Sequence, residues 1–100
     1  MDADAYQREA LKTLKDWGEP GELSDLVYLS LAINGEAGEL ANVVKKAWRD
    51  EKEIDKGWII EELGDILWYV AVLAHKLGVP LSEVMRKNIE KLRKRHGVKE

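Results

Sequence analysis

Residues 29–47 read LSLAINGEAGELANVVKKA, and the spacing within this stretch decides the fold class. Side chains that recur at steps of four and three residues share one face of an α-helix, whereas a strand shows a period of two. The side chains at that spacing are Leu29, Ile33, Glu36, Leu40, Val43 and Ala47. The stretch therefore predicts a long helix, which Ser24 caps and which can run to about Asp50.

Glycine and proline separate three further segments of helical length from this one. The first spans about residues 4–17, ends at Gly18, and has the pattern of a short amphipathic helix. Another spans about residues 57–77, and a last one is capped by Ser82 and ends at Gly97. No segment shows a sustained period of two, so we expect an all-α fold in which four helices form an antiparallel bundle.

Length and composition indicate one globular domain over residues 1–100. The absence of cysteine excludes disulfide scaffolds, zinc ribbons and thiol nucleophiles. The longest apolar run, residues 66–74, is about half the length of a membrane span, and the acidic N-terminus is unlike a signal peptide. We therefore expect a cytoplasmic protein with no membrane partner.

Charge is distributed unevenly along the chain. The net charge of −3 argues against a partner that is a nucleic acid polymer, although the last predicted helix is strongly basic.

The third predicted helix carries apolar residues on more faces than a monomer of this size needs to bury. The pattern therefore also predicts a homo-oligomer.

Four carboxylates stand at positions that a simple core does not explain. Glu36 interrupts the apolar stripe and Glu39 follows one turn later, while Glu62 and Asp65 repeat this spacing on the next predicted helix. Clustered anions repel one another unless a cation lies between them. Four hard oxygen ligands suit Mg²⁺ or Mn²⁺, and no Glu-x-x-His pair of the di-iron type occurs. The alternative is a solvated helix face paired with lysines.

Three glycines immediately precede these acids inside the predicted helices. Gly35, Gly38 and Gly64 each cost about 1 kcal/mol relative to alanine in a helix. Two explanations stay open: either the two helices cross closely at these positions, or a ligand approaches their backbones.

The motif GEAGEL at residues 35–40, followed after 22 residues by ELGD at 62–65, resembles the MazG-like family of all-α nucleoside triphosphate pyrophosphohydrolases. The similarity extends to Tyr6-Gln7 in the first predicted helix and to the basic segment 87–95. One departure is Arg95-His96-Gly97, where the family often has Arg-Tyr-Pro. The chain is similar to the short, single-unit members, which assemble as dimers or tetramers.

The resemblance implies hydrolysis of a (deoxy)nucleoside triphosphate to the monophosphate and pyrophosphate, by attack of water on the α-phosphate, in a role such as nucleotide-pool cleansing. It implies that Glu36, Glu39, Glu62 and Asp65 bind Mg²⁺, with Mn²⁺ as a substitute. Glu39 is our candidate for the base that accepts the proton of the water.

Candidate substrate contacts come from both the last predicted helix and the central pair of helices. The candidates are Lys87, Asn88, Lys91 and Arg95 for the phosphates, Tyr69 for the nucleoside and Lys46 as a helper. Basic residues also favour the C-terminal turns of helices for structural reasons alone. Two alternatives remain: a non-catalytic metal-binding bundle, and a same-fold enzyme with another nucleotide substrate, such as a dUTPase or a phosphoribosyl-ATP pyrophosphohydrolase.

Overall fold

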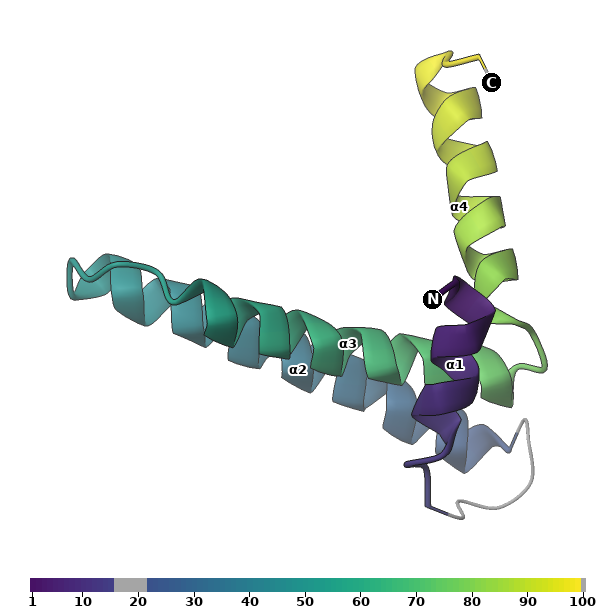
Figure 1. Cartoon of the computed structure of the whole chain (residues 1–100), viewed down its shortest axis with the longest axis horizontal. Coiled ribbons are helices and arrows are strands. Elements are labelled where there is room, and N and C mark those ends of the chain that lie inside the picture. Colours follow the sequence, from purple (N-terminus) through teal and green to yellow (C-terminus); the bar gives the residue numbers. More distant parts are fainter. Residues whose placement is uncertain (16–21, 100) are drawn as a thin grey trace.

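The computed structural model describes residues 1–15 and 22–99, and these residues form four α-helices and no strands. The helices are α1 (Ala3–Leu11), α2 (Leu23–Arg49), α3 (Lys56–Lys76) and α4 (Leu81–His96). α2 and α3 lie side by side as a long hairpin, α1 crosses the C-terminal end of α3, and α4 extends away from the hairpin (Figure 1). The prediction of an all-α chain is confirmed.

The hairpin of α2 and α3 is fixed at both ends. At its closed end, Asp55 caps α3 by accepting a hydrogen bond from the backbone N–H of Trp58 at 3.1 Å. At its open end, the buried ammonium of Lys76 pairs with the buried carboxylate of Asp25 at 3.1 Å. Because the pair joins the start of α2 to the end of α3, it opposes sliding of one helix along the other.

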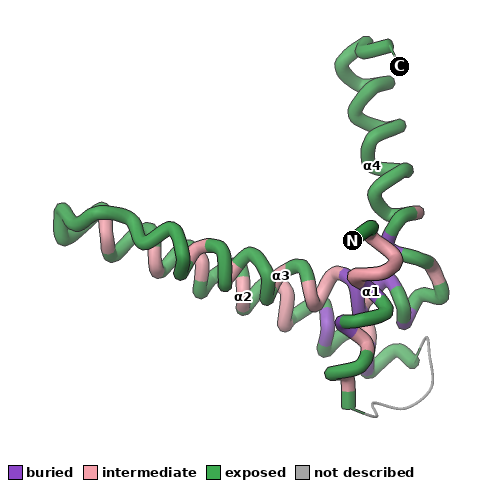
Figure 2. Tube along the Cα trace, viewed as in Figure 1, coloured by how far each residue is buried: buried purple, intermediate pink, exposed green. Residues whose placement is uncertain are grey.

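The buried core lies where α1 meets the hairpin and the start of α4 (Figure 2). Gln7 of α1 is buried there, and its amide N–H donates to the carbonyls of Ala71 at 3.0 Å and Val79 at 3.3 Å. Its amide oxygen accepts from the backbone N–H of Leu81 at 3.0 Å. Gln7 therefore joins α1 to the end of α3 and the start of α4.

The prediction that Ser24 and Ser82 cap α2 and α4 is wrong, because both serines lie inside the first turn of their helices. The N-cap of α2 is Glu22 and that of α4 is Pro80. Ser82 has another role: its N–H and its hydroxyl donate to the carboxylate of Asp4 at 2.9 and 2.7 Å. α1 thus supplies from a distance the acceptor that a local cap normally provides for α4.

The first helix is shorter than predicted. It ends at Leu11, and the next N–H groups bond only three residues back, as in Thr13 to Ala10 at 3.0 Å. The hydroxyl of Thr13 also donates to the carbonyl of Ala10 and accepts from the indole N–H of Trp68. These contacts favour a tight turn over another turn of α-helix, and the predicted end at Trp17 lies outside the described residues.

One chain does not close the antiparallel bundle that the sequence suggests. Gly78 adopts a φ of 79°, which favours glycine, and the turn that follows directs α4 away from α2 and α3. The radius of gyration is 16.1 Å, against about 13 Å for a compact chain of 100 residues. Within residues 1–15 and 22–99, no helix has the length and apolar character that crossing a membrane requires.

Candidate metal centre

Carboxylates of α2 and α3 meet midway along the hairpin. Glu36 of α2 and the pair Glu62 and Asp65 of α3 each offer one oxygen, and these oxygens lie within 4.8 Å of one another. The members of the α3 pair are three residues apart, so their side chains leave the helix on nearly the same side. The structure thus brings together three of the four acids that the sequence singles out.

Electrostatic repulsion at this cluster acts most clearly on Glu36. Burial raises the pKa of Glu36, and the negative charges of Asp65, Glu62 and Glu39 raise it further. Glu39 lies one turn further along α2 and is exposed. Its charge reaches Glu36, although it lies outside the tight group of three. The negative charges of the cluster therefore repel one another when no cation lies between them.

The two carboxylate oxygens of Glu62 have different surroundings. Its Oε1 accepts a hydrogen bond from the indole N–H of Trp58 at 3.1 Å. Its Oε2 is buried and has no hydrogen-bond donor among the described residues. Opposite ligands of an octahedral Mg²⁺ lie about 4.2 Å apart, close to the 4.8 Å limit of the cluster. Oxygen ligands at this spacing fit Mg²⁺ or Mn²⁺.

A cavity of about 330 Å³ opens beside the acids and is lined by Glu36, Asp65, Trp68 and Tyr69. The rings of Trp68 and Tyr69 meet edge to face at 4.9 Å. Burial raises the pKa of Tyr69, and Tyr28, Glu36 and Asp65 raise it further. Its phenol therefore stays protonated at neutral pH and can donate a hydrogen bond to a ligand in the cavity.

The sequence patterns assigned no role to Trp68, which lines the cavity, or to Tyr6, whose pKa responds to Asp65. Trp68 lines the cavity while its N–H donates to the carbonyl of Ala10 at 3.2 Å and to the hydroxyl of Thr13. Burial and the charge of Asp65 raise the pKa of Tyr6, which places this α1 residue near the acids. In the sequence, the one indication that Tyr6 faces the hairpin is its place one helical turn before Ala10, which is buried.

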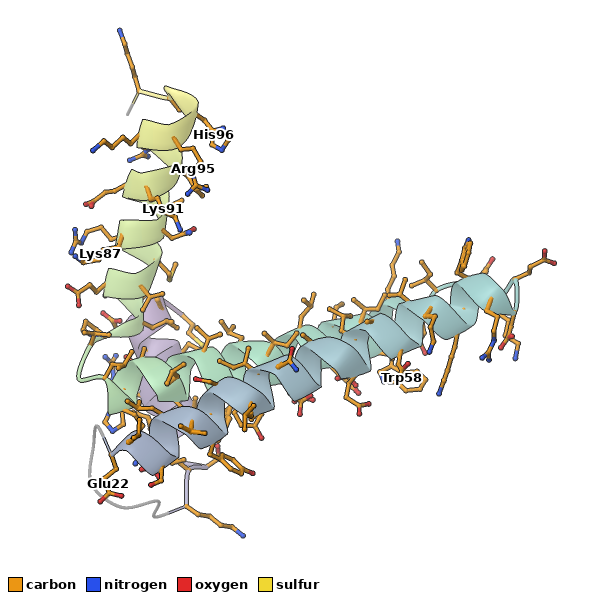
Figure 3. The ribbon with its side chains drawn as sticks, turned by 180° about the vertical axis from the view of Figure 1, so that it is seen from behind. Glu22, Trp58, Lys87, Lys91, Arg95 and His96 are labelled. Atoms are coloured by element: carbon orange, nitrogen blue, oxygen red, sulfur yellow. The ribbon has the colours of Figure 1, made fainter. Side chains whose placement is uncertain are left out.

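The basic candidates of α4 lie apart from the acids within one chain. Lys87, Lys91 and Arg95 project along α4, which points away from the hairpin (Figure 3). Asn88 belongs to the same helix. Lys46 lies toward the closed end of the hairpin, where it lines another cavity, of about 310 Å³, together with Trp58. Of the predicted substrate contacts, the structure brings Tyr69 alone to the cavity beside the acids.

The three glycines beside the acids face open space. A Cβ at Gly35, Gly38 or Gly64 would meet no atom of the described structure within 4 Å. Crowding between α2 and α3 of one chain therefore does not explain them. The other explanation from the sequence, close approach of a ligand to the helix backbone, remains.

Comparison with known proteins identifies the family to which this arrangement corresponds. Residues 26–98 match the family model described as the MazG nucleotide pyrophosphohydrolase domain. The chain belongs to this family. The matched range contains both acidic pairs and the whole of α3 and α4.

Two curated relatives resemble this MazG-family chain over nearly its full length. The Gene 37 protein of Mycobacterium phage L5 is 40% identical over 101 residues, which cover 95% of this chain and 89% of the phage protein. The protein YvdC of Bacillus subtilis (strain 168) is 36% identical over 103 residues, which cover 94% and 92%. Neither name states an activity, and no solved structure matches the chain.

Proposed function

We propose that this MazG-family chain is a metal-dependent pyrophosphohydrolase that converts (deoxy)nucleoside triphosphates to monophosphates and pyrophosphate. One observation carries the proposal. Carboxylate oxygens of Glu36, Glu62 and Asp65 converge within 4.8 Å, inside the segment that matches the family model. The raised pKa of Glu36 and the unpaired Oε2 of Glu62 support a cation at this point.

The proposed ligands of Mg²⁺, or of Mn²⁺ in its place, are Glu36, Glu39, Glu62 and Asp65. A bound cation would neutralise phosphate oxygens and make the attacking water more acidic. We propose that Glu39 accepts the proton of that water, because this exposed carboxylate lies beside the cluster. The protonated phenol of Tyr69 lies in the adjacent cavity and serves as a donor to the substrate.

We further propose that the active form is a homo-oligomer, a dimer or a tetramer. The single chain exposes 7649 Å², about 1,900 Å² more than a compact monomer of 11.4 kDa. Large homodimer interfaces bury about 1,000 Å² or more from each chain. Apolar side chains are exposed on both the hairpin and α4, namely Val27, Leu31, Ile60, Leu63 and Leu67, and Val84, Met85, Ile89 and Leu92.

The distribution of charge also favours an assembly in which α4 of one chain packs against the hairpin of another chain. α4 is basic over its last turns, whereas the hairpin carries the acidic cluster. In such an assembly Lys87, Asn88, Lys91 and Arg95 reach the phosphates of a substrate bound to the partner chain. Light scattering tests this, because Ile89→Glu places a charge on the apolar face of α4. The variant should run as a monomer where the wild type does not.

The activity is tested by measuring pyrophosphate release from a panel of ribo- and deoxyribonucleoside triphosphates, with Mg²⁺, with Mn²⁺ and with chelator. We expect metal-dependent release of pyrophosphate and monophosphate in equal amounts. Glu39→Gln should abolish it, whereas Glu61→Gln, an equal charge change at an exposed position on α3, should not. Metal binding without turnover of any nucleotide would refute the proposal and favour a non-catalytic bundle.

A further inference from the structure

Trp58 makes a specific contact with one of the proposed metal ligands. It lies four residues before Glu62 on α3, so the two side chains share a helix face. Its indole N–H donates to Oε1 of Glu62 at 3.1 Å, although the side chain is half exposed and also borders the cavity at the closed end of the hairpin. Figure 3 shows Trp58 on the hairpin, far from α4.

The backbone of Trp58 is held as well as its ring. Asp55, the N-cap of α3, accepts from the N–H of Trp58 at 3.1 Å. A capped first turn frays less than an open one, so the backbone that carries the indole keeps its position relative to Glu62. An indole N–H is also a donor only and does not titrate. The indole itself therefore remains a hydrogen-bond donor at every physiological pH.

The hydrogen bond leaves the two oxygens of Glu62 unequal. Oε1 is occupied by the indole, whereas the buried Oε2 has no donor in the described part of the chain. We propose that Trp58 is a positioning residue, which holds Oε1 of Glu62 so that this carboxylate binds the cation through Oε2 alone. The proposal rests on the metal site proposed above. Groups that orient a ligand in this way typically contribute 10- to 100-fold to metal affinity.

Trp58→Phe tests the proposal, because it keeps an aromatic ring and removes the donor. Titration calorimetry with Mn²⁺ alone, without nucleotide, should show binding about 10- to 100-fold weaker than in the wild type. Trp48→Phe is the matched control, since Trp48 is 82% exposed on α2, and it should bind Mn²⁺ as the wild type does. Trp58→Gln restores an N–H donor and should recover part of the affinity.

Melting curves in chelator separate positioning from a purely structural role. Trp58→Phe should melt close to the wild type without metal and lose most of the rise in Tm that Mn²⁺ produces. Unchanged Mn²⁺ affinity in Trp58→Phe, with normal binding by the wild type, would overturn the role of Trp58 and leave the metal site standing. Failure of the wild type to bind Mn²⁺ would overturn both.

Discussion

Replacing Glu36 by glutamine should stabilise the metal-free protein. Two neighbours, Glu62 and Asp65, offer oxygens within 4.8 Å of it. At that distance an effective dielectric constant of 20 gives about 3.5 kcal/mol of repulsion per pair of charges. Because Asp65 is exposed and water screens the cluster, about 0.5–1 kcal/mol per pair is the appropriate figure. Removing two pairs therefore stabilises the fold by about 1–2 kcal/mol, or about 5–10 °C in Tm.

The pH dependence of this effect follows from the pKa of Glu36. Burial and the neighbouring acids raise that pKa in the folded state. The folded protein thus holds the proton of Glu36 more tightly than the unfolded chain does. The resulting stability is complete below the unfolded pKa and is lost as the pH rises through the folded pKa. In chelator, the advantage of Glu36→Gln should therefore grow as the pH rises from the ordinary glutamate pKa through the raised pKa of Glu36 in the folded protein.

Adding metal should reverse the order of stability. At a concentration 100 times its Kd, Mg²⁺ adds about 2.7 kcal/mol to a protein that binds it only when folded. The wild type gains this stability and Glu36→Gln, which lacks a charged ligand, gains much less. Calorimetric melts in chelator and in Mg²⁺ measure both parts of the effect. Glu61→Gln controls for net charge, because Glu61 is an exposed neighbour of the cluster.

Either of two results would refute this reasoning. A lower Tm for Glu36→Gln in chelator would mean that its carboxylate stabilises the apo fold and that repulsion is not dominant. An equal response of the wild type and Glu36→Gln to Mg²⁺ would mean that Glu36 does not bind the cation. The response of Glu61→Gln should match the wild type in both conditions.

Three other changes test the surroundings of the site. Gln7→Ala leaves the N–H of Leu81 without its partner and should cost about 2–4 kcal/mol in urea unfolding; a loss under 1 kcal/mol would contradict the role of Gln7. Hydrogen bonds from the backbone N–H and then from the hydroxyl of Ser82 lower the pKa of Asp4. The stability that these bonds contribute is therefore present above the ordinary aspartate pKa, and it is lost as the pH falls through the pKa of Asp4 in the folded protein. The protection factor of the Ser82 amide, which compares its hydrogen exchange with the intrinsic rate at the same pH, should thus fall in acid, and Asp4→Asn should remove that fall. Gly38→Ala should stabilise α2 by about 1 kcal/mol. It should also lower pyrophosphate release, because we expect a ligand or a second chain to approach this position; unchanged activity would contradict that expectation.

The helices and the acidic cluster follow from local patterns. The four-and-three spacing from Leu29 to Ala47 predicts α2, which the structure confirms as Leu23–Arg49. Two acids three residues apart in a helix lie on nearly the same face, whichever residues begin and end that helix. A hairpin of two neighbouring helices then brings Glu36 to Glu62 and Asp65. Local spacing and a short connection were sufficient for this part of the site.

Contacts distant in sequence account for what the patterns missed. A serine before a helical run predicts a cap, yet the acceptor for the start of α4 is Asp4, 78 residues before Ser82. The nearness of Tyr6 to Asp65 depends on α1 crossing α3, which no periodicity within α1 encodes. The direction of α4 depends on Gly78 and on the contacts of Gln7. Such features arise from tertiary packing, which overrides local preference.

We propose one explanation for three separate features of the single chain. Gly35, Gly38 and Gly64 face open space beside the acids, so crowding between helices of one chain does not account for the cost of three helical glycines. The apolar side chains of α4 are exposed, and its basic side chains lie apart from the acids they would complement. A second chain that places α4 against the hairpin would cover the apolar face and bring cations to the phosphates. If Ile89→Glu gives a monomer that still binds Mn²⁺ but no longer releases pyrophosphate, the metal centre belongs to one chain and the substrate site to two.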